Sequence, residues 1–418
     1  MATFPNPLPP GRGMWRLVAQ SRQFAPGATP TVLAELSNAR GRQLVQAWDS
    51  AAMLTFTLDG HDPEAAALVE LATDVCAYRW DQTTPGADEE LMFRGIVAHS
   101  EDEVSEQDHV VIFQCYDYLK MLERRLITTT VDYSVATIDQ DALAALLVTL
   151  ATTTVESSSG TSFAPGAYLP LDVVYCAPDG SPRIAGAGTP ARNRTYLGSQ
   201  QISQALDDLA KVIGGFDYDV LPGGPGSPDH VRIFYPEQGE TRPSPVLAYG
   251  SSIASLTRTV NSGDYANYWR VLGNSATVDP AAPQLFGEVW NADANDVTRI
   301  PVGLWMSSDN AADVSIQSTL DQQAGGDLAI SSPLVPAYTL NLRPGFWTHR
   351  AINMGDVVPL VINSGRLNVN ATVRILGITY DIGDDGEEDV SLTVGRQPLT
   401  FTQLVTQADR TTDALTRR

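Results

Sequence analysis

The sequence contains few of the side chains that carry catalytic or metal chemistry. Its 418 residues include five histidines and three cysteines, and only two of its 27 basic residues are lysines. The histidines form no H-E-x-x-H or other metal-binding spacing, and Cys76, Cys115 and Cys176 form no C-x-x-C pair, so neither a zinc site nor a disulfide framework is indicated. We therefore predict three buried free thiols and no metal or cofactor.

Several other signatures are missing from the sequence. It has no G-x-S-x-G elbow, Walker A loop or G-x-G-x-x-G loop, so hydrolase and nucleotide chemistry lack support and we predict that the protein is not an enzyme. No apolar run reaches the ~18 residues that a membrane span needs, which predicts no direct membrane insertion. The first residues, MATFPNPLPPGRG, lack the basic and apolar regions of a secretory signal, and their four prolines predict an extended arm.

Positive charge is scarce relative to negative charge. The chain has 27 Lys and Arg residues against 49 Asp and Glu residues, which gives a formal net charge of −22. Such a surface does not bind phosphates by releasing counterions, so nucleic acid is not predicted as a ligand. Apolar residues make up 43% of the chain, which also holds 33 Gly and 27 Pro, and this composition predicts a folded, turn-rich and mostly β protein. A length of 418 residues predicts about three domains.

Short runs rich in β-branched and aromatic residues fill the first 115 residues. Leu54, Phe56 and Leu58 alternate with Thr55 and Thr57, which is the pattern of a strand with one buried face. Seven such runs, separated by Gly, Pro, Asn and Asp, predict a closed or nearly closed β unit. The predicted strands are Met14–Val18, Thr31–Leu36, Leu44–Trp48, Met53–Leu58, Val75–Trp80, Leu91–His99 and His109–Gln114.

From about residue 116 the apolar period becomes helical. Leu143, Leu146, Leu147 and Leu150 follow the i, i+3, i+4, i+7 spacing of one apolar stripe. Two strands follow these helices, so the segment predicts a small α/β domain inserted between β units. The predicted elements are helices at Tyr116–Arg125 and Asp139–Leu150, a helix that begins after an N-cap at Ser199 and ends at Gly214, and strands at Phe216–Leu221 and His230–Tyr235.

A second β unit is predicted from about Val246 onward, with an interruption at residues 275–332. In the interruption, Asp313–Leu328 predicts a helix weakened by Gly325 and Gly326. The spacing of apolar residues in Phe401–Arg418 predicts a C-terminal helix. The strands predicted for the second unit are Ile253–Val260, Tyr268–Gly273, Tyr338–Leu342, Asp356–Ile362, Leu367–Ile382 and Val390–Gly395, with Leu376, Ile378, Tyr380 and Ile382 on the same face as Val390, Leu392 and Val394.

A dense group of acids connects the last two predicted strands. An EF-hand needs acids at alternate positions, with glycine at the sixth position and glutamate at the twelfth, whereas these acids are nearly consecutive. The partial match in NADAND, with Asp293, Asn295 and Asp296, lacks the same glycine and glutamate. We therefore favour a solvated connection over a calcium site. The acids are Asp384, Asp385, Glu387, Glu388 and Asp389.

Seven tryptophans raise the alternative of sugar binding, because an exposed indole can stack on a pyranose ring. Five of them lie in or beside predicted strands, where packing in a core or an interface is the usual role. Trp290 and Trp305 lie in the interrupted stretch instead, so they are the candidates for glycan contact.

The order of the parts resembles the tail-tip hub, or minor tail, proteins of siphophages that infect actinobacteria, and through them the baseplate hubs of contractile phages and the hub portion of type VI secretion spikes. The resemblance covers nearly the whole chain and depends on the order of individually weak motifs. These motifs are LTFTLDG, TDVCAYRW, MFRGIVAHS, CYDYLKMLERRL, QQISQALDDLAKVIGGFDYDV, VNSGDYANYWRVLGN, MGDVVPLVI and VRILGITYDIGDDGEEDVSLTVGR.

The resemblance implies a mainly β chain with an α+β insertion, in which two tube-type β-barrel domains flank an inserted α/β domain. Three copies would form a homotrimer that joins the sixfold tail tube to a threefold central fibre or spike. The implied partners are a distal tail protein ring, the tape-measure protein and the fibre, with DNA passing only through the channel. The implied location is the tail tip of the virion, assembled in the cytoplasm of the host bacterium.

The resemblance also assigns a role to the acids and divides the chain. The acidic connection would contact the next ring or face the channel, where negative charge lets DNA slide. Two alternatives stay open, a tail-associated carbohydrate-binding protein and a cell-wall-degrading enzyme. The predicted domains are 1–115 for the first barrel, 116–245 for the α/β insertion, 246–274 with 333–398 for the second barrel, 275–332 for an insertion with a short helix, and 399–418 for a helical tail.

Overall fold

The structure is a computed structural model, and two compact units divide it. The first unit comprises Met1–Thr257 and Thr339–Val394, and the second comprises Arg258–Tyr338 and Gly395–Arg418. The predicted N-terminal arm, the C-terminal helix and the NADAND acids lie outside the described residues. The structure describes residues 13–395 except 24, 26, 82–88, 129–130, 134–136, 153–167, 193, 197, 211–213, 261, 264, 274–283, 292–302, 312–316, 333–335, 345, 347–350 and 385–387.

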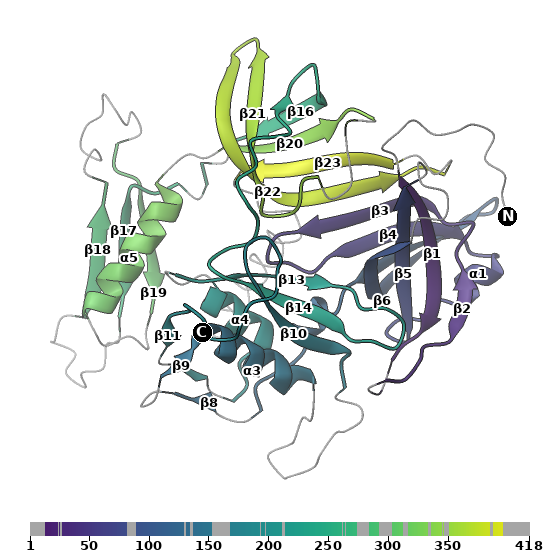
Figure 1. Cartoon of the computed structure of the whole chain (residues 1–418), viewed down its shortest axis with the longest axis horizontal. Helices are drawn as coiled ribbons and strands as arrows, with labels where there is room; N and C mark the ends of the chain where they lie inside the picture. Colours follow the sequence, from purple (N-terminus) through teal and green to yellow (C-terminus); the bar gives the residue numbers. More distant parts are fainter. Residues whose placement is uncertain are drawn as a thin grey trace. The chain divides into compact units, whose positions relative to one another are not determined.

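The first unit contains a sheet of 13 strands (Figure 1). We refer to β1–β7 as the first β part and to β15, β16 and β20–β23 as the second β part; a short helix, α1 (Pro63–Ala66), follows β4. The strands are β1 (Gly13–Ser21), β2 (Val32–Glu35), β3 (Arg40–Ala47), β4 (Met53–Asp59), β5 (Thr73–Asp81), β6 (Glu90–Val104), β7 (His109–Tyr116), β15 (Leu247–Ala248), β16 (Ile253–Thr259), β20 (Ala337–Leu342), β21 (Val357–Ser364), β22 (Leu367–Ile382) and β23 (Glu388–Gly395).

The two β parts share this single sheet. Its strand order is β16-β20-β23-β22-β3-β4-β7-β6-β5-β1-β2, with β21 paired to β22 and β15 paired to β21. Strands β22 and β3 pair antiparallel from Gly377 opposite Ala47 to Ile382 opposite Arg42, and this pairing joins the two parts. The seven strands predicted before residue 115 are confirmed. The predicted mainly β architecture with an α/β insertion is confirmed as well, whereas the residue boundaries of the domains stay a prediction.

The apolar alternation predicted for the last hairpin holds at one end and shifts at the other. Ile378, Tyr380 and Ile382 are buried, but Ile375 is buried in place of Leu376. A β-bulge between Ile375 and Gly377 changes the register with β23, and a bulge reverses which side chains face inward. The prediction that Leu376 shares the buried face was therefore wrong.

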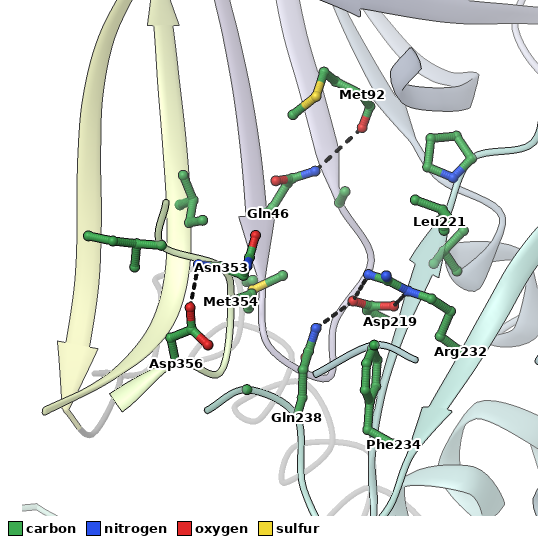
Figure 2. Close-up of a pocket in the computed structure, with 18 of the residues that line it drawn as sticks. Gln46, Met92, Asp219, Leu221, Arg232, Phe234, Gln238, Asn353, Met354 and Asp356 are labelled. Carbon is green, nitrogen blue, oxygen red and sulfur yellow. Dashed lines mark hydrogen bonds and ion pairs between the residues drawn. The ribbon is translucent and has the colours of Figure 1, made fainter. Parts of the chain in front are cut away.

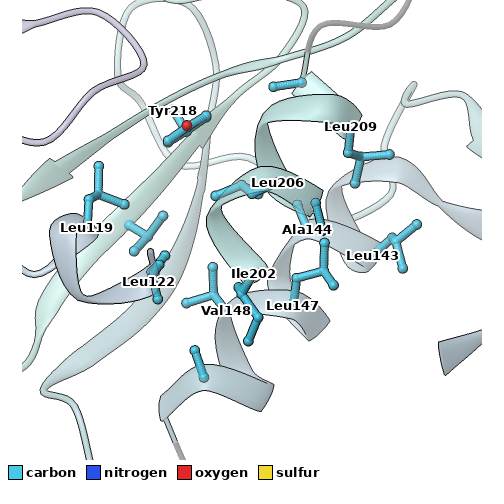
Figure 3. Packing of buried hydrophobic residues seen from close by; sticks show 14 of the residues in the cluster. Leu119, Leu122, Leu143, Ala144, Leu147, Val148, Ile202, Leu206, Leu209 and Tyr218 are labelled. Carbon is cyan, nitrogen blue, oxygen red and sulfur yellow. The ribbon is translucent and has the colours of Figure 1, made fainter. Parts of the chain in front are cut away.

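The insertion, residues 117–235, packs helices on a three-stranded sheet of order β10-β14-β13 (Figures 1 and 3). Leu143 and Leu147 of the predicted stripe are fully buried, and Leu146 and Leu150 pack beside them as partly buried side chains. Each fully buried leucine contributes roughly 2 kcal/mol of transfer free energy. The elements are α2 (Leu119–Leu122), β8 (Val131–Asp132), β9 (Ile138–Asp139), α3 (Gln140–Thr152), β10 (Leu171–Cys176), β11 (Ala191–Arg192), β12 (Thr195–Tyr196), α4 (Ile202–Ala210), β13 (Asp217–Leu221) and β14 (Asp229–Phe234).

Two helix predictions in the insertion were wrong in extent. The helix predicted at Tyr116–Arg125 is only the single turn α2. Tyr116 still belongs to β7, and the Asp117 carboxylate accepts from the Leu119 N–H at 3.0 Å where the chain leaves that strand. Ser199 is not the N-cap of α4. Its φ of +79° is left-handed, and its N–H donates to the Ile127 carbonyl at 2.8 Å, so the helix begins three residues later.

The second unit has a three-stranded sheet with one helix on it. Its elements are β17 (Tyr268–Leu272), β18 (Phe286–Trp290), β19 (Met306–Asn310) and α5 (Gln317–Ser331). Strand β17 lies in the middle, antiparallel to β18 and parallel to β19, so the strand predicted at Tyr268–Gly273 pairs here rather than in the 13-stranded sheet. Val271, Leu320 and Ala324 form its buried core, and α5 includes both predicted helix-weakening glycines.

Candidate functional site

The acidic connection does not form one solvated group. Asp384 and Asp389 are exposed, as predicted, whereas Asp385 and Glu387 lie outside the described residues. Glu388 is only 3% exposed and lies in the interior. The prediction that Glu388 solvates the connection or faces a channel was wrong, because a buried arginine neutralises this carboxylate.

Glu388 forms a buried ion pair with Arg79 that joins the two β parts. Arg79 Nη2 lies 2.7 Å from Glu388 Oε1, and Arg79 Nε lies 3.0 Å from Oε2. The Trp15 indole donates to Oε2 at 2.7 Å, and the Gly13 N–H donates to Oε1 at 2.9 Å. Each carboxylate oxygen of Glu388 therefore accepts two hydrogen bonds, and the bidentate contact with Arg79 is strong and directional.

The sequence carried a signal for the burial of Glu388 that we missed. Glu388 shares its strand parity with Val390 and Leu392, which are buried, so alternation places it on the inward face. The crowding of exposed acids around it obscured that parity.

A second buried ion pair joins the first β part to the insertion. Arg94 of β6 and Asp229 of β14 are 1% and 0% exposed, and Arg94 Nη2 lies 2.6 Å from Asp229 Oδ1. Burial raises the pKa of Asp229 to about 6, against the opposing effect of Arg94. Nearby, the Tyr118 hydroxyl donates to both oxygens of Asp74 at 2.9 Å. Burial raises the pKa of Asp74 to about 7, although this hydrogen bond opposes the change.

Two further arginines join the second β part to the insertion and to the segment after it. Arg374 of β22 pairs with Asp217 of β13, and its Nη2 also donates to the Gln238 carbonyl at 2.8 Å. Arg242 Nε donates to Asp356 Oδ2 at 2.6 Å. Each pairing of the three parts thus includes an ion pair that is at least partly shielded from water.

A cavity of about 400 Å³ lies within the first unit, lined by all three parts (Figure 2). Its polar side chains mostly bind one another. The Asp219 carboxylate accepts from Arg232 Nε and Nη2 at 2.7 and 2.6 Å and from Gln238 Nε2 at 2.7 Å. Asp117 also lines the cavity, and burial raises its pKa to about 7.

Two arginines of the cavity lining bind carboxylates of the same lining, Arg232 with Asp219 and Arg242 with Asp356. Within the described ranges, no group of three His, Cys, Asp or Glu residues could hold a metal ion. The three cysteines are buried and free, as predicted. None of the helices that the structure describes is long and apolar enough to span a membrane.

The two tryptophans predicted as glycan contacts are both on the surface of the second unit. Trp290 is 54% exposed and Trp305 is 44% exposed. The Trp290 ring lies nearly parallel to Tyr268, with centroids 6.3 Å apart, and the Trp305 ring meets the edge of Tyr265 at 6.5 Å. Glycan contact at these residues stays a prediction.

Comparison with known proteins identifies the fold. No family model matches the chain, and no curated protein sequence matches it. A tail protein from Neisseria meningitidis MC58 aligns at a TM-score of 0.56 and 11% identity, covering 92% of this chain and 97% of that one. The 43 kDa tail protein of prophage MuSo2 from Shewanella oneidensis aligns at 0.55 and 10% identity, covering 91% and 98%.

A component of the type VI secretion system from E. coli is also similar, at a TM-score of 0.43 and 9% identity, covering 86% of this chain and 76% of that one. The matches to the two tail proteins confirm the resemblance predicted from the sequence motifs at the level of the fold: the chain has the fold of phage and prophage tail proteins along nearly its whole length.

Proposed function

We propose that this chain is a structural, non-enzymatic protein of a bacteriophage tail, and more specifically the hub of the tail tip. In this role three copies form a symmetry adaptor between the sixfold tail tube and a threefold central fibre or spike, around the channel through which DNA is ejected. The observation that carries the proposal is the fold shared with two tail proteins over more than nine-tenths of each chain.

The shared sheet supports this role. A ring wall has to resist separation of its parts, and here β22 and β3 bind the two β parts through backbone hydrogen bonds while Arg79 and Glu388 bind them through side chains. The sheet path ends at β2 and β16, and β2 carries Val32 and Leu33, which are 64% and 46% exposed. Exposed edge strands favour pairing with another chain, which is how a closed ring would cover them.

The charge of the chain also supports a channel role. A net charge of −22 repels DNA phosphates over a screening length of roughly 8 Å at physiological salt, so a DNA strand would slide past rather than bind. Asp384 and Asp389 are the described acids of the connection that remain candidates for the channel or the ring contact. The proposed partners are the distal tail protein ring, the tape-measure protein and the central fibre.

Threefold averaging of the tail tip in intact virions tests the proposal. We expect three copies of this fold around one axis, with the sheets of all copies in a single ring. A density map that fits the chain in any other copy number, or away from the axis, would refute the hub assignment. Incubation with purified peptidoglycan tests the enzymatic alternative, and we expect no release of soluble fragments.

A further inference from the structure

The three-stranded sheet of the second unit has one face covered by α5. The Trp269 indole donates to the Ser331 hydroxyl of α5, and a Cβ on Gly287 would overlap the backbone of Leu320 in the same helix. Side chains alternate between the two faces of a strand, so the residues flanking Trp269 and Gly287 point to the opposite face. We call that opposite face the open face.

The register of the sheet arranges the open face in three rows across the strands. One row is apolar and aromatic, the middle row is charged and polar, and the last row is mixed. Trp290, Met306 and Phe286 are exposed at 54%, 57% and 38%. The rows are Trp290, Tyr268 and Met306; Glu288, Arg270 and Ser308; and Phe286, Leu272 and Asn310.

The aromatic pair is held rigidly by the middle row. The Tyr268 hydroxyl donates to Glu288 Oε2 at 2.5 Å, and Arg270 Nη2 donates to the same oxygen at 2.9 Å and to the Tyr268 oxygen at 3.0 Å. Tyr268 therefore has a fixed position, and Trp290 lies nearly parallel to it with an interplanar angle of 13°. Trp290 is 54% exposed beside this ring, so part of its indole is open to solvent.

The charges on the open face cancel. Arg270 is paired with Glu288 and lies over the Phe286 ring, 4.6 Å from its centroid. The hydrogen bonds from Tyr268 and Arg270 lower the pKa of the Glu288 carboxyl, which keeps it ionised. Glu288 neutralises the positive charge of Arg270, and the chain as a whole carries a net charge of −22. The open face therefore does not attract an anionic polymer, and it favours a neutral ligand.

We propose that the open face binds a neutral saccharide, with the apolar face of a pyranose ring stacked on Trp290 and its hydroxyls hydrogen bonded to Arg270 and Glu288. An aromatic ring beside a polar charged pair suits a sugar, which is apolar on its ring face and polar at its rim. The mixed rows favour a sugar over a protein partner, because the charged row interrupts the continuous apolar core that a protein interface needs. This site is independent of the hub assignment.

Saturation-transfer NMR and isothermal titration of the whole chain test the site against tetramers of N-acetylglucosamine, galactose, mannose and rhamnose. We expect at least one tetramer to bind, and a sulfated form of that tetramer to bind more weakly. Trp290→Ala should weaken binding at least tenfold, and Trp290→Tyr should restore part of it. Arg270→Ala should also weaken binding.

Tyr249→Ala is the control, since this aromatic side chain is 44% exposed and belongs to the first unit, not to the open face. We expect it to bind the tetramer like the unmodified chain. Unchanged circular dichroism establishes that each variant is folded. The proposal is overturned if no tetramer binds, if Trp290→Ala and Tyr249→Ala lose binding equally, or if Trp290→Ala leaves binding unchanged.

Discussion

The ion pair between Glu388 and Arg79 gives the sharpest stability prediction. Replacing Glu388 with Gln keeps the size and shape of the side chain but removes its charge. Arg79, which is 2% exposed, then loses the carboxylate that pairs with two of its guanidinium nitrogens, and an amide group faces them instead. Breaking a buried ion pair by removing one partner costs about 3–5 kcal/mol.

We expect the low end of that range, about 3 kcal/mol, because a glutamine oxygen still accepts from Trp15 Nε1. At roughly 2–4 °C per kcal/mol for a large domain, the midpoint of thermal unfolding should shift down by about 6–12 °C. Thermal unfolding followed by near-ultraviolet circular dichroism measures the shift, since Trp15 reports on the site directly.

Two variants show whether the shift comes from the ion pair. Asp389→Asn makes the same chemical change one residue along, at an exposed position, and should change stability by less than about 0.5 kcal/mol. The double variant Arg79→Met with Glu388→Gln removes both charges and keeps the acceptor, so it should be more stable than Glu388→Gln alone. Equal shifts for Glu388→Gln and Asp389→Asn, or a double variant less stable than the single one, would refute the reasoning.

Three further predictions concern other parts of the fold. Leu147→Ala, at a fully buried position, should cost about 2–5 kcal/mol in urea unfolding, and Leu150→Ala, at a partly buried position, should cost clearly less. Burial raises the pKa of Asp74 from 3.8 to about 7, so the folded chain keeps a proton that the unfolded chain releases over this range. Stability should therefore fall as pH rises from about 4 to 7, and Asp74→Asn should flatten that slope in urea midpoints; an unchanged slope would contradict it. Gly287→Ala should displace α5, because the new Cβ would overlap the backbone at Leu320. The helical signal in circular dichroism should then fall. A helix content equal to that of the original chain would argue against this contact.

The sequence predicts elements better than it predicts their partners. Strands such as β4 follow from local alternation, and α3 follows from the spacing of Leu143 and Leu147, because both patterns depend on the nearest neighbours along the chain. The pairing of β17 with β18 and β19 depends on residues far away in the sequence, so no local pattern specified it. The helix start at Ser199 was misplaced because a distant carbonyl fixes its backbone.

The same contrast between local patterns and pairings of distant residues applies to the candidate sites. Trp290 and Trp305 were singled out because they lie in the interrupted stretch, and both are exposed, although Trp290 belongs to β18. The partner of Glu388 is 309 residues away along the chain, and a single sequence carries no signal for such a pair. The alternation of side chains along its strand could have predicted that Glu388 is buried, but not which residue it pairs with.

The length of β22 has a mechanical consequence. Its first half pairs with β21 and its second half lies between β3 and β23, so a single 16-residue strand is anchored at both ends to different neighbours. A torque applied to either end has to bend this strand against several hydrogen bonds before it can rotate one β part relative to the other. The two β parts are therefore joined through one strand, and a change of diameter in a ring built from them would have to break the pairing of β22 with β3 or come from sliding between copies.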